Sequence, residues 1–182
     1  MSEVEKNMRG TLYSLYYSLL FTTLISVSAI YDIIYVDNIY NINYTSYQLL
    51  FFYLFTDIIR YLLFDINNLH TSIFLHHIIG LIGVFFAYSN YYYKIIIDKY
   101  LLYEISTIFL NMYLIKKTYI YTLLFFISFT SIRIIYGSTL LLNLINDTNI
   151  NNLYIFISLF FQSINYYWYY YIIHKLIRLY NS

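Results

Sequence analysis

The chain has 182 residues, of which 61% are hydrophobic and only 10% are charged, and its formal net charge is +1. A soluble domain carries about 25% charged residues, so this composition excludes an ordinary water-exposed surface and indicates a membrane protein. The small net charge and the lack of a basic arm argue against nucleic acid as a partner, and the absence of cysteine excludes disulfide and thiolate chemistry.

Long apolar stretches separated by short polar connectors predict about six membrane-spanning helices, because a helix of roughly 20 apolar residues crosses a bilayer. We therefore predict an all-α, polytopic membrane helix bundle, with residues 1–10 as a cytosolic tail and residues 11–182 as a single domain. The fifth span is the longest, and Gly137 is a point at which it could bend. The predicted spans are Thr11–Tyr31, Tyr44–Phe64, Thr71–Ser89, Ile95–Ile115, Tyr119–Ile145 and Asn152–Leu179.

The first span has an alternative interpretation as a signal peptide. Its segment "SVSA" at Ser26–Ala29 matches a small-x-small cleavage pattern. The long apolar stretch and the mixed charges of "MSEVEKNMRG" favour a membrane helix instead.

The distribution of cations predicts the orientation of the bundle. With six spans, both termini and the connectors after the second and fourth spans share one side of the membrane. Cytosolic loops are rich in Lys and Arg, so the more basic side, and both termini with it, is predicted to be cytosolic. That side carries Lys6, Arg9, Lys116, Lys117, Lys175 and Arg178, and the other side carries Lys94 and Lys99.

Polar and ionisable residues recur in the second to sixth spans, where each is costly in lipid and is a candidate for function. Counted at about 1.5 Å of rise per residue, they fall between the cytosolic third and the middle of the bilayer. We therefore predict a polar pocket inside the bundle, open towards the cytosolic leaflet. The polar and ionisable residues of these five spans include Asp57, Arg60, His76, His77, Glu104, Asn111, Arg133, Gln162 and Asn165.

Structural roles remain open for several of these residues. Asp57 and Arg60 are three positions apart on one helical face and could form an ion pair within the second span. Glu104 could pair with Arg133 to hold the fourth and fifth spans together. A single membrane histidine is often a hydrogen-bonding link between helices.

Two adjacent histidines differ from one, because neighbouring side chains diverge by about 100° around a helix. His76 shares a stripe with Gly80 and Gly83, which predicts a close helix contact on that face. His77 is then predicted to face the pocket. Adjacent histidines lack the i, i+4 spacing of helical metal ligands, so we predict no metal site, and only His174 could serve as a second axial ligand for haem.

Several of these segments together resemble the TLC-domain family, multispanning endomembrane proteins that include the ceramide synthases. The histidine pair is followed by "LLYEISTIFLN" at Leu101–Asn111, which is similar to the family's Glu-x-Ser-Thr-Pro-Phe-x-Asn segment. "INYYWYYYII" at Ile164–Ile173 is similar to its final Asn–Trp helix, and Asp57 lies where the family often has Asp. The resemblance runs from the second span to the C-terminus.

The chain departs from the ceramide synthase pattern in three places. Ile108 stands where proline is usual, and no arginine follows shortly after Asn111. Between the histidine pair and Glu104 there is Asp98 but no His-Asp-x-x-Asp element. The lipid-homeostasis branch of the family is therefore the nearer likeness.

The resemblance implies two hypotheses about function. In the first, the protein handles lipid without catalysis, and a lipid or acyl chain occupies the pocket. The polar residues assigned to that pocket are His77, Glu104, Asn111, Arg133 and Asn165.

In the second hypothesis, the protein is a ceramide-synthase-like N-acyltransferase that takes acyl-CoA as co-substrate. His76 and His77 would act as base or nucleophile, with Asp57 orienting them. Neither hypothesis needs a cofactor, and both place the protein in an endomembrane such as the ER or in the plasma membrane, or in a host membrane if a virus encodes it.

Overall fold

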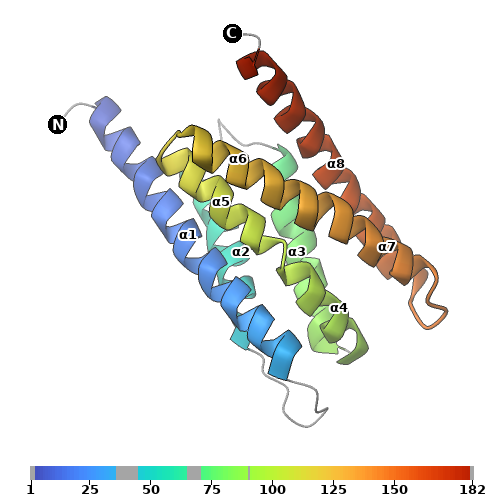
Figure 1. The fold of residues 1–182 in the computed structure, drawn as a ribbon. Coiled ribbons are helices and arrows are strands. Elements are labelled where there is room, and N and C mark those ends of the chain that lie inside the picture. Colours follow the sequence, from blue (N-terminus) through green and yellow to red (C-terminus); the bar gives the residue numbers. More distant parts are fainter. Residues whose placement is uncertain (1–2, 36–44, 65–70, 90, 181–182) are drawn as a thin grey trace.

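The computed structural model describes residues 3–35, 45–64, 71–89 and 91–180, and this part of the chain is almost entirely helical, without strands (Figure 1). The all-α prediction is confirmed. The helices are α1 (Glu3–Tyr35), α2 (Thr45–Phe64), α3 (Thr71–Ser89), α4 (Tyr91–Leu101), α5 (Glu104–Ile115), α6 (Tyr119–Ser128), the π-helix η2 (Phe129–Tyr136), α7 (Gly137–Ile145) and α8 (Asn152–Tyr180).

The described helices form six rods, because α4 and α5 follow each other across a short turn and α6, η2 and α7 run on without interruption. The rods reproduce the predicted spans closely, since the polar connectors supply the helix ends. Thr118 caps α6 by accepting a hydrogen bond from the Tyr121 amide at 3.4 Å. Asn151 Oδ1 accepts one from the Leu153 amide at 2.8 Å at the start of α8.

The first rod is longer than predicted. Helix α1 begins at Glu3, so most of the predicted tail, residues 1–10, forms its first turns. The segment contains no proline, and Glu3 and Glu5 lie where the helix dipole favours negative charge. The side chains of this segment lie outside the described residues.

Neighbouring rods pack as a bundle that is apolar both in its core and on its outer surface. Helix α1 packs against α2, α4 and α5, α3 packs between α2 and α4, and α8 packs against η2, α7 and α3 (Figure 1). The core includes Ile25, Leu54 and Val84, while Phe85 and Tyr119 on the outside are 72% and 81% exposed. Large apolar side chains on the outer surface are what a lipid environment requires.

Two of the described helical stretches are long and apolar enough to cross a membrane on their own. These are Leu12–Ile34 in α1 and Tyr119–Ile145 in the α6 to α7 rod, each with a mean hydropathy of 1.6. Tyr47–Ile59 and Phe74–Phe86 are shorter apolar stretches. Crossing by all six rods stays a prediction.

Two backbone irregularities meet in the middle of the bundle. One is the turn at Leu102 and Tyr103 between α4 and α5, and the other is η2, which ends directly before Gly137. Gln162 Nε2 of α8 donates to the Arg133 carbonyl oxygen of η2 at 2.8 Å. A Cβ at Gly137 would overlap the Tyr103 hydroxyl and lie 2.8 Å from Gln162 Oε1, so this crossing requires glycine.

A polar cluster formed by Tyr47, Lys94 and Asp98 lies inside the bundle. The position of Lys94 in it differs from the one predicted from the sequence. Lys94 was expected in a connector, but it is only 3% exposed. Its Nζ lies 3.4 Å from Asp98 Oδ2 and 5.2 Å from the centre of the Tyr47 ring. The Tyr47 hydroxyl donates to the Lys94 carbonyl oxygen at 2.8 Å and contacts Asp98 Oδ1. Lys94 is buried because Asp98, one turn further along α4, can pair with it.

Candidate functional site

A cavity of about 190 Å³, the central cavity, lies between α1, α2, α3, α5, α6, η2 and α8. Most of the residues predicted for a shared polar pocket line it, although they come from separate helices. Of the predicted set, the lining includes Asp57, His76, His77, Glu104, Asn111 and Arg133. All six are buried, so the polar groups are withheld from lipid and face a common space.

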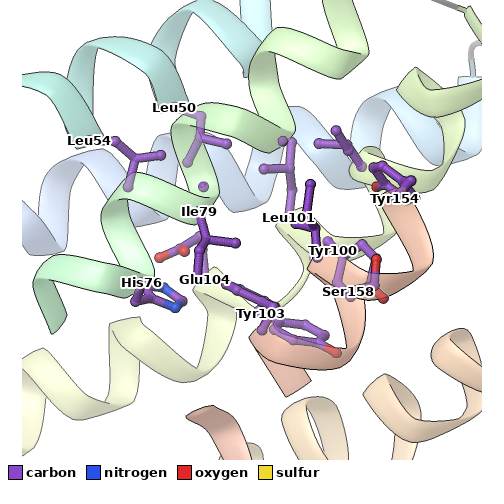
Figure 2. Close-up of a pocket in the computed structure, with 15 residues that line it drawn as sticks. Leu50, Leu54, His76, Ile79, Tyr100, Leu101, Tyr103, Glu104, Tyr154 and Ser158 are labelled. Atoms are coloured by element: carbon purple, nitrogen blue, oxygen red, sulfur yellow. The ribbon is translucent and has the colours of Figure 1, made fainter. Parts of the chain in front are cut away.

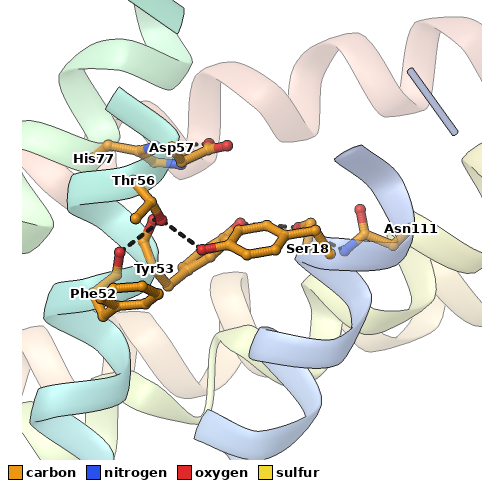
Figure 3. A network of polar contacts seen from close by, with 8 residues as sticks. Ser18, Phe52, Tyr53, Thr56, Asp57, His77 and Asn111 are labelled. Atoms are coloured by element: carbon orange, nitrogen blue, oxygen red, sulfur yellow. Dashed lines mark hydrogen bonds and ion pairs between the residues drawn. The ribbon is translucent and has the colours of Figure 1, made fainter. Parts of the chain in front are cut away.

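Asp57 and His77 form a buried pair across α2 and α3. His77 Nδ1 lies 3.1 Å from Asp57 Oδ2, and both side chains are 7% exposed (Figure 3). A carboxylate at Nδ1 favours the tautomer with the proton on that nitrogen, in which Nε2 is the unprotonated nitrogen of the ring. Asp57 therefore pairs across helices, whereas the sequence suggested Arg60, whose side chain lies outside the described residues.

His76 contacts α8 through its ring. The ring stacks on Phe161 with centroids 4.8 Å apart and an interplanar angle of 19°, and it lies 5.1 Å from the Trp168 ring. Its Nδ1 is buried and has no hydrogen-bond partner among the described residues. Both histidines line the central cavity, which differs from the predicted division of roles, because α3 lies between α2 and α8 and exposes two of its faces to the interior.

Arg133 is held by neutral groups. Its Nε donates to Ser106 Oγ at 2.7 Å, and its Nη2 donates to Thr107 Oγ1 at 2.8 Å and to the Tyr103 carbonyl oxygen at 3.4 Å. Among the described residues no ion pair within 4.0 Å joins it to Glu104, so the predicted alternative of a direct salt bridge is not what the structure shows. Rings of Tyr103, Phe129 and Trp168 lie 5.4–5.8 Å from the guanidinium carbon.

Asn165 supports Arg133 instead of lining the central cavity. Its Oδ1 accepts a hydrogen bond from Arg133 Nη1 at 3.1 Å, and its Nδ2 donates to the Phe161 carbonyl oxygen at 3.2 Å. The side chain is fully buried, and it is absent from the residues that line the cavity. This differs from its predicted place in the pocket. The cause is the orientation of α8, which directs Trp168 to the cavity and Asn165 to the guanidinium.

A hydroxyl network that the sequence did not predict surrounds Asn111. Asn111 Nδ2 donates to Ser18 Oγ at 2.9 Å, and Ser18 Oγ lies 2.9 Å from the Tyr53 hydroxyl (Figure 3). Ser18 and Tyr53 also line the central cavity. The sequence alone does not identify Ser18 or Tyr53 as part of the site. The chain contains 27 tyrosines, and the contact between Ser18 and Tyr53 depends on how α1, α2 and α5 are rotated.

A second, smaller cavity of about 80 Å³, the apolar cavity, adjoins the central one. Leu54, His76 and Glu104 line both, so these side chains lie at the boundary between the two spaces. Figure 2 shows these three side chains among the residues that line the apolar cavity. Glu104 is the first residue of α5 and follows the turn at Tyr103 directly. The remaining lining of the smaller cavity is mainly aliphatic and aromatic and includes Leu50, Ile79, Gly80, Gly83, Ile97 and Leu101.

This arrangement combines a polar compartment with an apolar one. The central cavity offers carboxylates, imidazoles and a guanidinium, while the apolar cavity is lined mainly by hydrocarbon and aromatic groups apart from His76 and Glu104 at the shared boundary. Such a pair of spaces suits an amphipathic guest. Among the described residues no group of three or more His, Cys, Asp or Glu could hold a metal ion.

Comparison with known proteins agrees with the resemblance read from the sequence. The pattern of the TLC domain matches residues 10–174. A protein of Acanthamoeba polyphaga mimivirus named "Putative TLC domain-containing protein" is 37% identical over 125 residues, which is 62% of each chain. No solved structure matches. The chain therefore belongs to the TLC domain family, and it is a membrane protein whose family membership associates it with membrane lipids.

Proposed function

We propose that this protein is a multi-pass membrane protein that binds or senses a lipid or acyl chain inside its bundle and thereby affects membrane lipid composition. The observation that carries the proposal is the pair of adjoining cavities, one polar and one apolar, which share Leu54, His76 and Glu104. A lipid has the same division into a polar head and an apolar tail.

The polar end of the guest would occupy the central cavity. Asp57, His77, Glu104 and Arg133 provide charges of both signs within one lining, and Asn111 provides an amide. The Nδ1 atom of His76 is buried without a hydrogen-bond partner among the described residues. A buried polar atom is costly when it is left unpaired, so a guest that donates or accepts a hydrogen bond there would be stabilised.

We also propose that the guest enters from the cytosolic leaflet, which depends on the orientation of the bundle. We propose six membrane crossings with both termini in the cytosol. The start of α1, the end of α8 and the link between α5 and α6 lie at the same end of the bundle (Figure 1). Lys116, Lys117 and Lys175 are exposed there. At the other end Lys94 is buried and paired, which leaves Lys99 as the exposed cation of α4 and increases the charge asymmetry.

The test is a mass spectrum of lipids extracted from the detergent-purified protein. We expect a defined lipid class to copurify with the wild-type protein at a molar ratio near one. Glu104→Leu should be purified in the same protein yield but should carry less of this lipid. Leu124→Ala, an exposed position on α6, is the control and should keep the lipid. A wild-type protein that carries only the bulk detergent-extracted lipid mixture would overturn the proposal.

A second candidate function is N-acyl transfer from acyl-CoA to a sphingoid base. The pairing of Asp57 with His77 favours it, because an imidazole oriented by a carboxylate can accept the proton of an attacking amine. The amine nitrogen would form a bond to the thioester carbonyl carbon, the bond from that carbon to sulfur would break, and coenzyme A would leave as the thiol. Incubation of the purified protein with both substrates should yield an amide that His77→Ala abolishes. No amide from wild-type protein would leave lipid binding as the function.

A further inference from the structure

Gly83 occupies a place on α3 where the apolar cavity has room for added carbon atoms. A Cβ built at Gly83 would meet only Ile97 Cδ1, at 3.7 Å, which is an ordinary van der Waals distance. The same addition at Gly80 would approach Leu54 Cδ1 to 2.7 Å and would require that side chain to move. Both glycines line the apolar cavity, but only at Gly83 would a methyl group occupy free space.

Helix packing does not explain glycine at this position. Gly137 shows what a packing requirement looks like, since a Cβ there would overlap the Tyr103 hydroxyl. Gly83 has no such close neighbour, and glycine in a helix interior is less favourable than alanine. The lack of a side chain at Gly83 therefore keeps part of the apolar cavity open and does not serve a close helix contact.

The size of that space makes each added carbon significant. An apolar cavity of roughly 150 Å³ accommodates the six carbons of benzene, so the apolar cavity of about 80 Å³ corresponds to about three carbons. Alanine at Gly83 would take up about a third of this space, and the three added carbons of valine would fill it.

We propose that Gly83 sets the length of the lipid tail that the protein accepts. The inference rests on the proposed lipid-binding function and adds to it a residue that determines specificity. The polar end of the guest lies in the central cavity, the chain passes Leu54, His76 and Glu104, and its terminal methylenes end against Gly83 and Ile97. The ligand class is an amphipathic lipid selected by the length of an aliphatic chain.

The experiment is a graded series, Gly83→Ala, Gly83→Val and Gly83→Leu, on the full chain. Each purified variant is incubated with an equimolar mixture of one lipid class carrying tails of increasing length, and the bound fraction is analysed by mass spectrometry. The class is the one that copurifies with the wild type. We expect the preferred tail to shorten by about one carbon in the alanine variant and by about three in the valine variant. Ile82→Val, on the exposed side of the same helix, is the matched control and should keep the wild-type profile.

The outcomes separate the two proposals. A wild-type tail-length profile in the folded, lipid-loaded alanine and valine variants would overturn the role of Gly83 and leave lipid binding intact. A wild-type protein that selects no lipid would overturn the proposed function, and the role of Gly83 with it. If the bulky leucine variant fails to fold, the alanine and valine variants still decide, because alanine introduces no close contact.

Discussion

In the described part of the bundle, two buried polar clusters resemble each other in composition and differ in packing. The cluster of Tyr47, Lys94 and Asp98 pairs a cation with a carboxylate under an aromatic ring, and none of its members lines either cavity. The groups around the central cavity also include carboxylates and a cation, but they enclose about 190 Å³ of space.

The difference distinguishes polar groups that stabilise the fold from polar groups that can bind a guest. Lys94 and Asp98 pair within one turn of α4, and the Tyr47 hydroxyl contacts Asp98 as well, so these groups find their partners within the bundle. Arg133 is held by hydroxyl, carbonyl and amide groups instead of a carboxylate, and Glu104 faces both cavities. Charge that remains directed into open space is the feature expected of a binding site.

The largest expected effect is on stability and comes from breaking the closed cluster. Lys94→Met should lower the free energy of unfolding by roughly 3–5 kcal/mol, because Asp98 then remains buried without its cation. Thermal unfolding in detergent and the monodisperse yield measure this. Lys99→Met, an exposed cation on the same helix, is the control and should behave as wild type. If Lys94→Met were as stable as the wild type, the cluster would have no structural role.

A smaller loss of stability is expected where the two backbone irregularities meet. Gly137→Ala should cost about 1–3 kcal/mol, because the added methyl group must displace Tyr103 and weaken its 3.1 Å hydrogen bond to Gln162 Oε1. The melting temperature measures the effect. Gly83→Ala makes the same chemical change in open space and should melt at or above the wild-type temperature. Equal melting temperatures for the two variants would contradict this interpretation of η2.

The same substitution in both clusters tests the comparison directly. Asp57→Asn should reduce stability by only about 1 kcal/mol, since an amide can still hydrogen-bond to His77, but it should deplete bound lipid. Asp98→Asn removes the carboxylate that pairs with the buried Lys94, so it should reduce stability more and leave the lipid of the surviving protein unchanged. Melting temperature and lipid stoichiometry measured together distinguish the variants. Equal lipid depletion in both would mean that the two clusters do not differ in function.

The smallest expected effect concerns the hydroxyl network at the edge of the central cavity. Ser18→Ala removes the acceptor of Asn111 and the contact with Tyr53, and should cost roughly 0.5–1.5 kcal/mol. Lipid stoichiometry should fall less than in Asp57→Asn. Thr23→Ala is the matched control, because among the described residues the Thr23 hydroxyl donates to the Leu19 carbonyl oxygen of its own helix. A stronger depletion of lipid in Ser18→Ala than in Asp57→Asn would place the polar end of the guest nearer α1.

Much of the fold could be predicted because helix positions depend on local sequence. The fifth rod, Tyr119–Ile145, begins and ends at the predicted residues, since polar connectors on both sides end the apolar run. The extension of α1 back to Glu3 could not be read from hydropathy, because the first turns are polar. The convergence of Asp57, His77 and Glu104 followed from their depth along the helices, which a rise of about 1.5 Å per residue determines.

The sequence by itself determined the all-helical class, most of the helix ends and the family, since apolar run length and short motifs are properties of neighbouring residues. Only the tertiary structure decided which buried groups are partners. It pairs Asp57 with His77, buries Lys94 against Asp98, and directs Asn165 to Arg133 and not into the cavity. The physical reason is that partnership across a bundle depends on the rotation and tilt of each rod, which the packing of all the rods together determines.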